Sequence, residues 1–204
     1  MPWWDEELLR LVDADDPAGV DAHMADLVQA SLDEIVADIA KKFPDRSKIV
    51  EQVVRAFEQG DFELAVLGAL SQADGITYEI LGVSAFGKRD GRPATSPHAE
   101  ALRAAAGSGN LDWELIDLDP LIDGSSLLIS TAARDQGRAL DPHFGPLNRH
   151  GALHGLDHGY GSRENALRAF SALGYFLGLR ELLNLQPASP TASVGPLSAT
   201  PPGT

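Results

Sequence analysis

The segment Leu147–Gly155 carries residues whose types and spacing suit phosphate chemistry. It contains Arg149, His150 and His154. A guanidinium is a planar, permanently charged fork for phosphate oxygens, and an imidazole can take up or release a proton near neutral pH. In RNA, a base can deprotonate the ribose 2′-OH, whose oxygen then attacks the adjacent phosphorus while a cation stabilises the developing charge. Arg149 and His154 are therefore our candidate catalytic residues.

The spacing of these two residues limits how they can act together. Side chains five positions apart on an ideal helix point about 140° away from each other. Arg149 and His154 would converge if the helix unwinds at Gly155, or if a second chain supplies one of the partners. This offset favours a composite site in a homodimer.

A metal site is the main alternative for the histidines, because His143, His150, His154 and His158 fall within a short stretch. The last three follow each other at steps of four residues, and two histidines spaced so on a helix can chelate zinc. However, a glycine follows each of the three, which disfavours a continuous helix. The glutamate of the metalloprotease motif is also replaced, by Gly151. We therefore expect no metal and no other cofactor, and we expect His143 and His158 to be exposed loop residues.

Composition and charge exclude several other classes of protein. The chain has no cysteine, no Gly-x-Ser-x-Gly elbow and no phosphate loop, which leaves no familiar nucleophile or nucleotide motif. Its formal net charge of −14 argues against a surface for long duplexes, although a small pocket for one or two phosphates is compatible with it. The basic cluster Lys88, Arg89 and Arg92 lies in a predicted loop over 82–97, and we expect a solvated loop there rather than an RNA-steering surface.

The elements that must position this segment are predicted to be helices, because Ala and Leu dominate the apolar residues and aromatic residues are only 6% of the chain. Apolar residues recur at three- and four-residue steps in several segments. We expect a short helix within 1–18, a six-turn helix from Val20 to Lys42, and further helices over 46–59, 62–81, 96–106, within 121–134 and over 163–183. A helical turn is expected around 147–153.

The chain is predicted to be an all-α protein in three parts. These are an N-terminal helical extension (1–45), a helical domain (46–185) and a disordered tail rich in Pro, Ala, Ser and Thr (186–204). No apolar run approaches the about 20 residues of a membrane span, and the N-terminus lacks the features of a signal peptide. We expect a cytoplasmic protein that does not contact membranes.

Gln72 and Asp74 are polar residues within the otherwise apolar helix over 62–81. Buried polar groups need partners. These two side chains could support the histidine segment from behind, or could form an interhelical hydrogen bond that fixes register, which is the interpretation we favour slightly.

The segment Arg149–His154 resembles the Arg-x4–6-His signature of the HEPN superfamily (higher eukaryotes and prokaryotes nucleotide-binding domains). Its flanks, the helix beginning at Glu164 and the stretch Gln72–Ile76 are similar to a bacterial subgroup of that superfamily. The resemblance implies a helical bundle that dimerises, with two Arg–His motifs at a shared cleft. It further implies a metal-independent endoribonuclease of the kind found in toxin–antitoxin or phage-defence systems.

By the same resemblance, Arg149 and His154 would be catalytic, His150 the auxiliary polar residue, and Asn148 a residue that orients the phosphate or Arg149. The implied partners are RNA or a nucleotide, a second copy of the chain, and a cognate antitoxin or inhibitor. The alternative is a catalytically silent HEPN-like module that binds a nucleotide or a protein.

Overall fold

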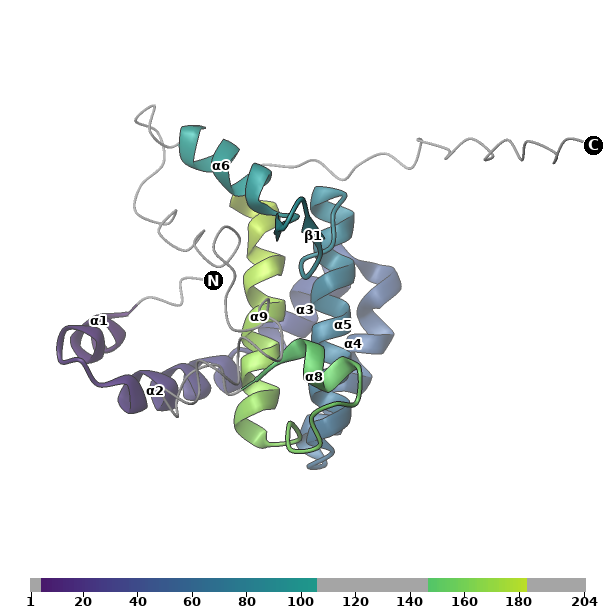
Figure 1. The fold of residues 1–204 in the computed structure, drawn as a ribbon. Coiled ribbons are helices and arrows are strands. Elements are labelled where there is room, and N and C mark those ends of the chain that lie inside the picture. Colours follow the sequence, from purple (N-terminus) through teal and green to yellow (C-terminus); the bar gives the residue numbers. More distant parts are fainter. Residues whose placement is uncertain (1–4, 106–146, 183–204) are drawn as a thin grey trace, which may run out of the picture.

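The computed structural model describes residues 5–105 and 147–182, and helices make up most of this part of the chain (Figure 1). It confirms a mostly helical fold. The predicted helix within 121–134, His143 and the predicted tail over 186–204 lie outside the described residues. The described elements are α1 (Glu6–Asp13), α2 (Pro17–Ala30), α3 (Leu32–Lys42), α4 (Pro44–Glu58), α5 (Phe62–Leu81), β1 (Lys88–Arg89), β2 (Arg92–Pro93), α6 (Ser96–Ala105), α8 (Arg149–Leu153) and α9 (Arg163–Leu182).

Helices α5 and α9 lie side by side at the centre of the molecule (Figure 1). They run in the same direction. A Cβ added to Gly161, just before α9, would meet Glu63 in the first turn of α5. At the other end, the ring of Phe86, just after α5, contacts that of Phe176 in α9, with centroids 6.1 Å apart. Helix α4 packs against α5, as expected for a helix whose apolar residues fall on one face.

The core between these helices combines small residues of α5 with large residues of α9. Ala65, Ala69 and Ala73 are fully buried on α5, while Phe170 and Leu173 are fully buried on α9. Small side chains let helix backbones approach closely, and each large buried side chain contributes about 1.5–3 kcal/mol relative to exposure. Ser162 begins α9 as predicted, because its hydroxyl accepts a hydrogen bond from the Asn165 amide at 3.2 Å.

The predicted six-turn helix from Val20 to Lys42 is wrong in one respect, because the structure divides it into α2 and α3 at Ser31. The Ser31 hydroxyl donates a hydrogen bond to the carbonyl of Leu27 at 2.8 Å, and its backbone N–H bonds Leu27 and Val28. The hydroxyl bond competes with the regular backbone bond for the Leu27 carbonyl, and such bonds often bend helices. The apolar periodicity continues across Ser31, so the sequence pattern could not reveal the break between α2 and α3.

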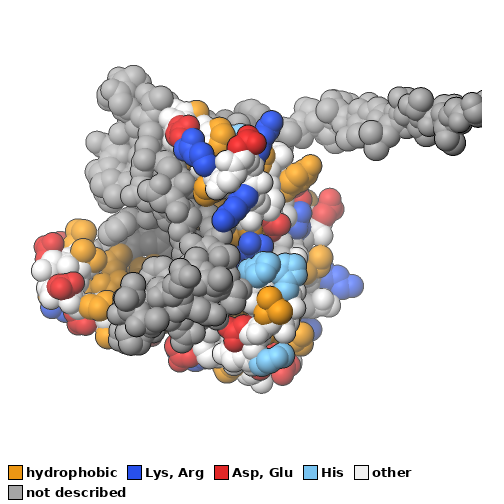
Figure 2. All heavy atoms as spheres, in the orientation of Figure 1, with side chains coloured by type: hydrophobic (Ala, Val, Ile, Leu, Met, Phe, Trp, Pro, Cys, Tyr) orange, Lys and Arg blue, Asp and Glu red, His pale blue; other side chains and the backbone are white. Residues whose placement is uncertain are grey.

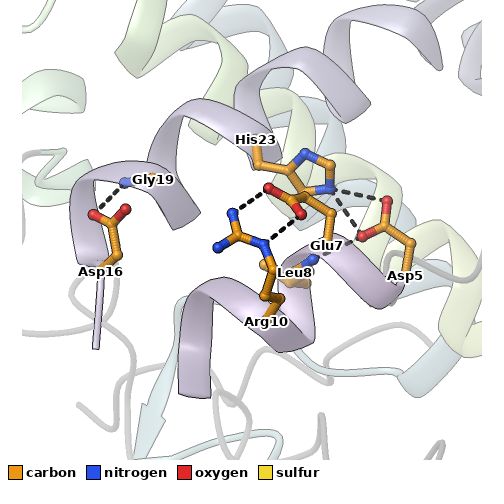
Figure 3. A network of polar contacts seen from close by, with 7 residues as sticks. All are labelled: Asp5, Glu7, Leu8, Arg10, Asp16, Gly19 and His23. Carbon is orange, nitrogen blue, oxygen red and sulfur yellow. Dashed lines mark hydrogen bonds and ion pairs between the residues drawn. The ribbon is translucent and has the colours of Figure 1, made fainter. Parts of the chain in front are cut away.

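Helix α1 is held against α2 by a polar network near the chain's beginning (Figure 3). Asp5 accepts a hydrogen bond from the Leu8 amide at 2.8 Å and so caps α1. Both of its carboxylate oxygens also lie 2.9 Å from Nε2 of His23 in α2. Helix α2 is joined to the bundle by an ion pair between Arg168 of α9 and Asp21, at 2.7 Å.

The segment predicted to be a loop over 82–97 contains a short β-hairpin, which is a second correction. Strands β1 and β2 pair antiparallel, with Arg89 directly opposite Arg92. The connecting Asp90 and Gly91 both have positive φ, 53° and 80°, and an Asp-Gly pair in this conformation is a favoured two-residue hairpin turn. The Asp90-Gly91 dipeptide was therefore a sequence signal for this hairpin.

No helix within residues 5–105 and 147–182 combines the length and apolar character that a bilayer span requires.

Candidate functional site

The short helix α8 carries the Arg149–His154 segment, and Asn148 fixes its beginning. Asn148 is fully buried, and its side-chain oxygen accepts a hydrogen bond from the Gly151 amide at 2.7 Å. Gly151 is packed tightly, since a Cβ there would lie 3.0 Å from Cβ of Asp157. The structure thus places Asn148 as the N-cap of α8, where it orients the turn that carries Arg149.

Helix α8 ends at its C-cap residue His154, and a glycine in the left-handed conformation follows it. Gly155 has a left-handed φ of 65°, its amide donates to the Ala152 carbonyl at 3.3 Å, and the Leu156 amide donates to the Gly151 carbonyl at 2.8 Å. This is the usual way in which a glycine stops a helix. The helix therefore unwinds at Gly155, after His154, and the convergence of Arg149 and His154 stays a prediction.

His150 and His154 form a pair of imidazole rings on one face of this turn. Their centroids are 4.4 Å apart and the ring planes are inclined by 57°. His150 is half-buried and His154 is exposed. Figure 2 shows histidine side chains gathered over α8 with basic side chains next to them. Among the described residues, no group of three or more His, Asp or Glu side chains is arranged to hold a metal ion.

Arg149 is directed to Phe86, in the loop between α5 and β1. Its Nη2 donates a hydrogen bond to the Phe86 carbonyl at 3.4 Å, and its guanidinium carbon lies 5.0 Å from the centre of the Phe86 ring. The ring face attracts a cation. Burial lowers the pKa of Arg149, and the negative charge of Asp74 partly opposes this. A guanidinium stays charged under either influence.

Asp74 and Gln72 point to different partners. Asp74 accepts a hydrogen bond from the Ser84 hydroxyl at 2.6 Å, in the loop that also carries Phe86. Gln72 is buried and accepts a hydrogen bond from Arg46 of α4 at 2.9 Å. Gln72 therefore makes the interhelical bond, while Asp74 lies on the side of α5 near Arg149.

Phe86 is a site residue that the sequence analysis missed. It is buried, and it contacts both Arg149 and Phe176. A weak signal existed in the sequence. Ala85 and Phe86 form an apolar pair between Gly82 and Gly87, and an apolar pair inside a polar, glycine-rich loop indicates an anchor to the core.

Helix α8 thus carries a cation that the loop after α5 holds, and a pair of imidazole rings within the same short helix and its C-cap. Such an arrangement can bind a phosphate through Arg149 and move protons through the histidines. Comparison with known proteins finds no match among protein-family models, curated proteins or solved structures. The geometry of these residues is therefore the basis for assigning a function.

Proposed function

We propose that this protein is a metal-independent endoribonuclease, in keeping with the resemblance of Arg149–His154 to the HEPN signature. One observation carries the proposal. A single helical turn, fixed at both ends, presents Arg149 against Phe86 and the rings of His150 and His154 at 4.4 Å from each other. Residues held by a rigid turn are positioned before the substrate arrives, which lowers the entropic cost of reaction.

The proposed reaction proceeds by attack within the RNA chain. His154, which is exposed, accepts the proton of the ribose 2′-OH as the general base. The 2′ oxygen then bonds to the adjacent phosphorus, the bond from phosphorus to the 5′ oxygen breaks, and that oxygen takes a proton from His150 in its protonated form. The products are a 2′,3′-cyclic phosphate and a 5′-hydroxyl. Arg149 stabilises the negative charge that builds up on the phosphate oxygens.

The ring pair suits this exchange of protons. The ring centroids lie 4.4 Å apart, which puts two groups that can exchange protons within reach of one phosphodiester. General acid–base catalysis needs two such groups, since one must accept a proton and the other must donate one.

We also propose that the active form is a homodimer in which α8 lies at the contact. Leu153 and Leu156 flank His154, and they are 41% and 62% exposed. Exposed apolar side chains beside a polar site are typical of surfaces that are covered by a partner. A second copy would exclude water from the two sites and bring additional cations to the substrate.

A nucleotide-binding module without catalysis is the second candidate, and the contacts of Arg149 favour it specifically. The anchoring of this side chain by Phe86 provides a phosphate site that does not require His154. The two candidates share the cation and differ in whether the imidazoles transfer protons.

Incubation of the purified protein with RNA in EDTA tests the proposal. We expect cleavage that leaves 2′,3′-cyclic phosphate ends, loss of cleavage in Arg149→Ala and His154→Ala, and partial activity in Arg149→Lys, which keeps the charge but lacks the fork. His158→Ala is the matched control, because His158 is exposed in the same segment, and it should cleave as well as the wild type.

Other outcomes would reject the proposal. If the folded wild type cleaves no RNA but binds a mononucleotide in a manner that depends on Arg149, the binding module is correct. If EDTA abolishes cleavage and zinc restores it, the chemistry is not the metal-independent reaction described above.

A further inference from the structure

The β1–β2 hairpin carries positively charged residues and directly follows the loop that contacts Arg149 of α8. Lys88, Arg89 and Arg92 are exposed on it. The hairpin follows Phe86, whose ring and carbonyl contact Arg149, by two residues. Two residues of chain span at most about 7 Å. Lys88 therefore follows closely along the chain from the residue that holds the guanidinium at the proposed phosphate site.

The hairpin places two like charges next to each other. Arg89 and Arg92 are cross-strand partners, and their side chains share one face of the ribbon. Like charges directly opposite each other destabilise a strand pair. The charge of Arg92 is compensated, because Arg92 forms an ion pair with Glu100 of α6 at 2.5 Å. This leaves the charge of Arg89 on that face, while Lys88, the preceding residue of the strand, projects from the other face.

The protein as a whole is acidic, so a local group of cations on its surface differs from its surroundings in the sign of its charge. The net charge is −14, so a polyanion is repelled by most of the molecule and is drawn to the few places where cations gather. Figure 2 shows Lys and Arg side chains on the same face as the histidines of α8, toward α6. The hairpin and Arg149 are connected through Phe86, which lies two residues before β1 and accepts the hydrogen bond of Arg149.

We propose that the hairpin binds the backbone of a single-stranded RNA, at phosphates next to the one held by Arg149. This inference rests on the proposed function and specifies its substrate as an oligonucleotide rather than a dinucleotide. A few cations suit a single strand, whereas a long duplex requires an extended basic surface. A phosphate-directed contact carries no base recognition, so the hairpin contributes affinity without sequence preference.

The test uses a variant that removes two hairpin charges and keeps the Arg92–Glu100 pair. Lys88→Ser with Arg89→Ser is compared with Lys48→Ser and Arg55→Ser, two exposed cations of α4, which lies behind α5 in Figure 1. The probe is a fluorescent single-stranded DNA of 12 nucleotides, which carries the phosphates of RNA but no 2′-OH. Its binding is therefore measured independently of cleavage.

We expect the hairpin variant to bind the 12-nucleotide probe on the order of tenfold more weakly at low salt, with a salt slope reduced by about 0.7 for each phosphate contact that is lost. The α4 variant should bind as the wild type does. With RNA, the hairpin variant should show a raised KM for a 12-nucleotide substrate and an unchanged kcat.

The outcomes separate this inference from the proposed function. If the wild type cleaves RNA and the two double variants bind and cleave alike, the hairpin inference is overturned and the ribonuclease proposal stands. If binding depends on the hairpin but no RNA is cleaved, the ribonuclease proposal fails and the hairpin is supported as a binding surface. Binding that is weak and identical in all three proteins overturns the inference.

Discussion

The guanidinium of Arg149 lies 5.0 Å from the centre of the Phe86 ring and donates a hydrogen bond to the Phe86 carbonyl. This contact joins α8 to the loop that follows α5, across 63 positions of the sequence. It fixes the direction of the cation and connects the α8 site to the basic hairpin.

Phe86→Leu should reduce RNA cleavage while the protein stays folded. Leucine fills much of the same space but offers no ring face, so Arg149 loses a cation–π contact of about 0.5–2 kcal/mol. We expect cleavage to fall roughly threefold to tenfold. Phe57→Leu is the matched control, because Phe57 is buried against Phe170, with centroids 5.6 Å apart, away from α8. Equal activity in the two variants would show that Phe86 serves packing alone.

Two glycine-to-alanine substitutions should change stability in opposite directions. Gly155→Ala places a side chain at a left-handed φ of 65° and should lower the free energy of unfolding by about 1–2 kcal/mol. Gly178→Ala lies inside α9 with no atom within 4 Å of its Cβ, and should raise it by about 0.5–1 kcal/mol. Urea denaturation measures both. A neutral Gly155→Ala would mean that the C-cap of α8 does not require left-handed backbone.

Much of the helical fold was predictable from the sequence, and the reason is visible in α4. Val50, Val54 and Phe57 recur at three- and four-residue steps and are all buried, because the period of a helix decides which side chains share a face. The break at Ser31 followed from a hydroxyl bonding to a nearby carbonyl. Such a local bond leaves no trace in the apolar pattern.

The candidate site was predictable in residue type but not in geometry. Arg149 and His154 stood out by their chemistry, whereas the partner of Arg149 did not, since no local pattern relates Phe86 to a residue so distant in sequence. The role of Asn148 as an N-cap was also hidden. An Asn before a short helical turn suits both a cap and a phosphate contact, and only the position of its side chain decides between them.

Acidification should loosen α1 before the rest of the molecule. The hydrogen bond from the Leu8 amide, and then that with His23, hold the pKa of Asp5 below its usual value of 3.8. The stabilising contribution of Asp5 is therefore fully present above pH 3.8 and is lost as the pH falls through the lowered pKa. Hydrogen exchange of the Leu8 and Leu11 amides should accelerate in this range. Asp5→Ala should exchange fast at every pH, whereas Asp13→Asn should behave as the wild type does.

Asp74→Asn should strengthen the binding of a phosphate at Arg149. Burial lowers the pKa of Arg149, and the carboxylate of Asp74 opposes this shift, so the negative charge of Asp74 acts on the guanidinium and opposes an incoming anion. In the wild type, the Ser84 hydroxyl donates a hydrogen bond to Asp74 at 2.6 Å. Asparagine keeps a side-chain oxygen that can accept this bond and removes the charge. We expect the affinity for a mononucleotide, measured by calorimetry, to rise about twofold to fivefold, with a smaller increase at high salt because the effect is electrostatic. Asp38→Asn, which removes a charge paired with Lys42 on α3, controls for the change in net charge. If both variants gain affinity equally, the cause is the overall charge, and Arg149 is not where the phosphate binds.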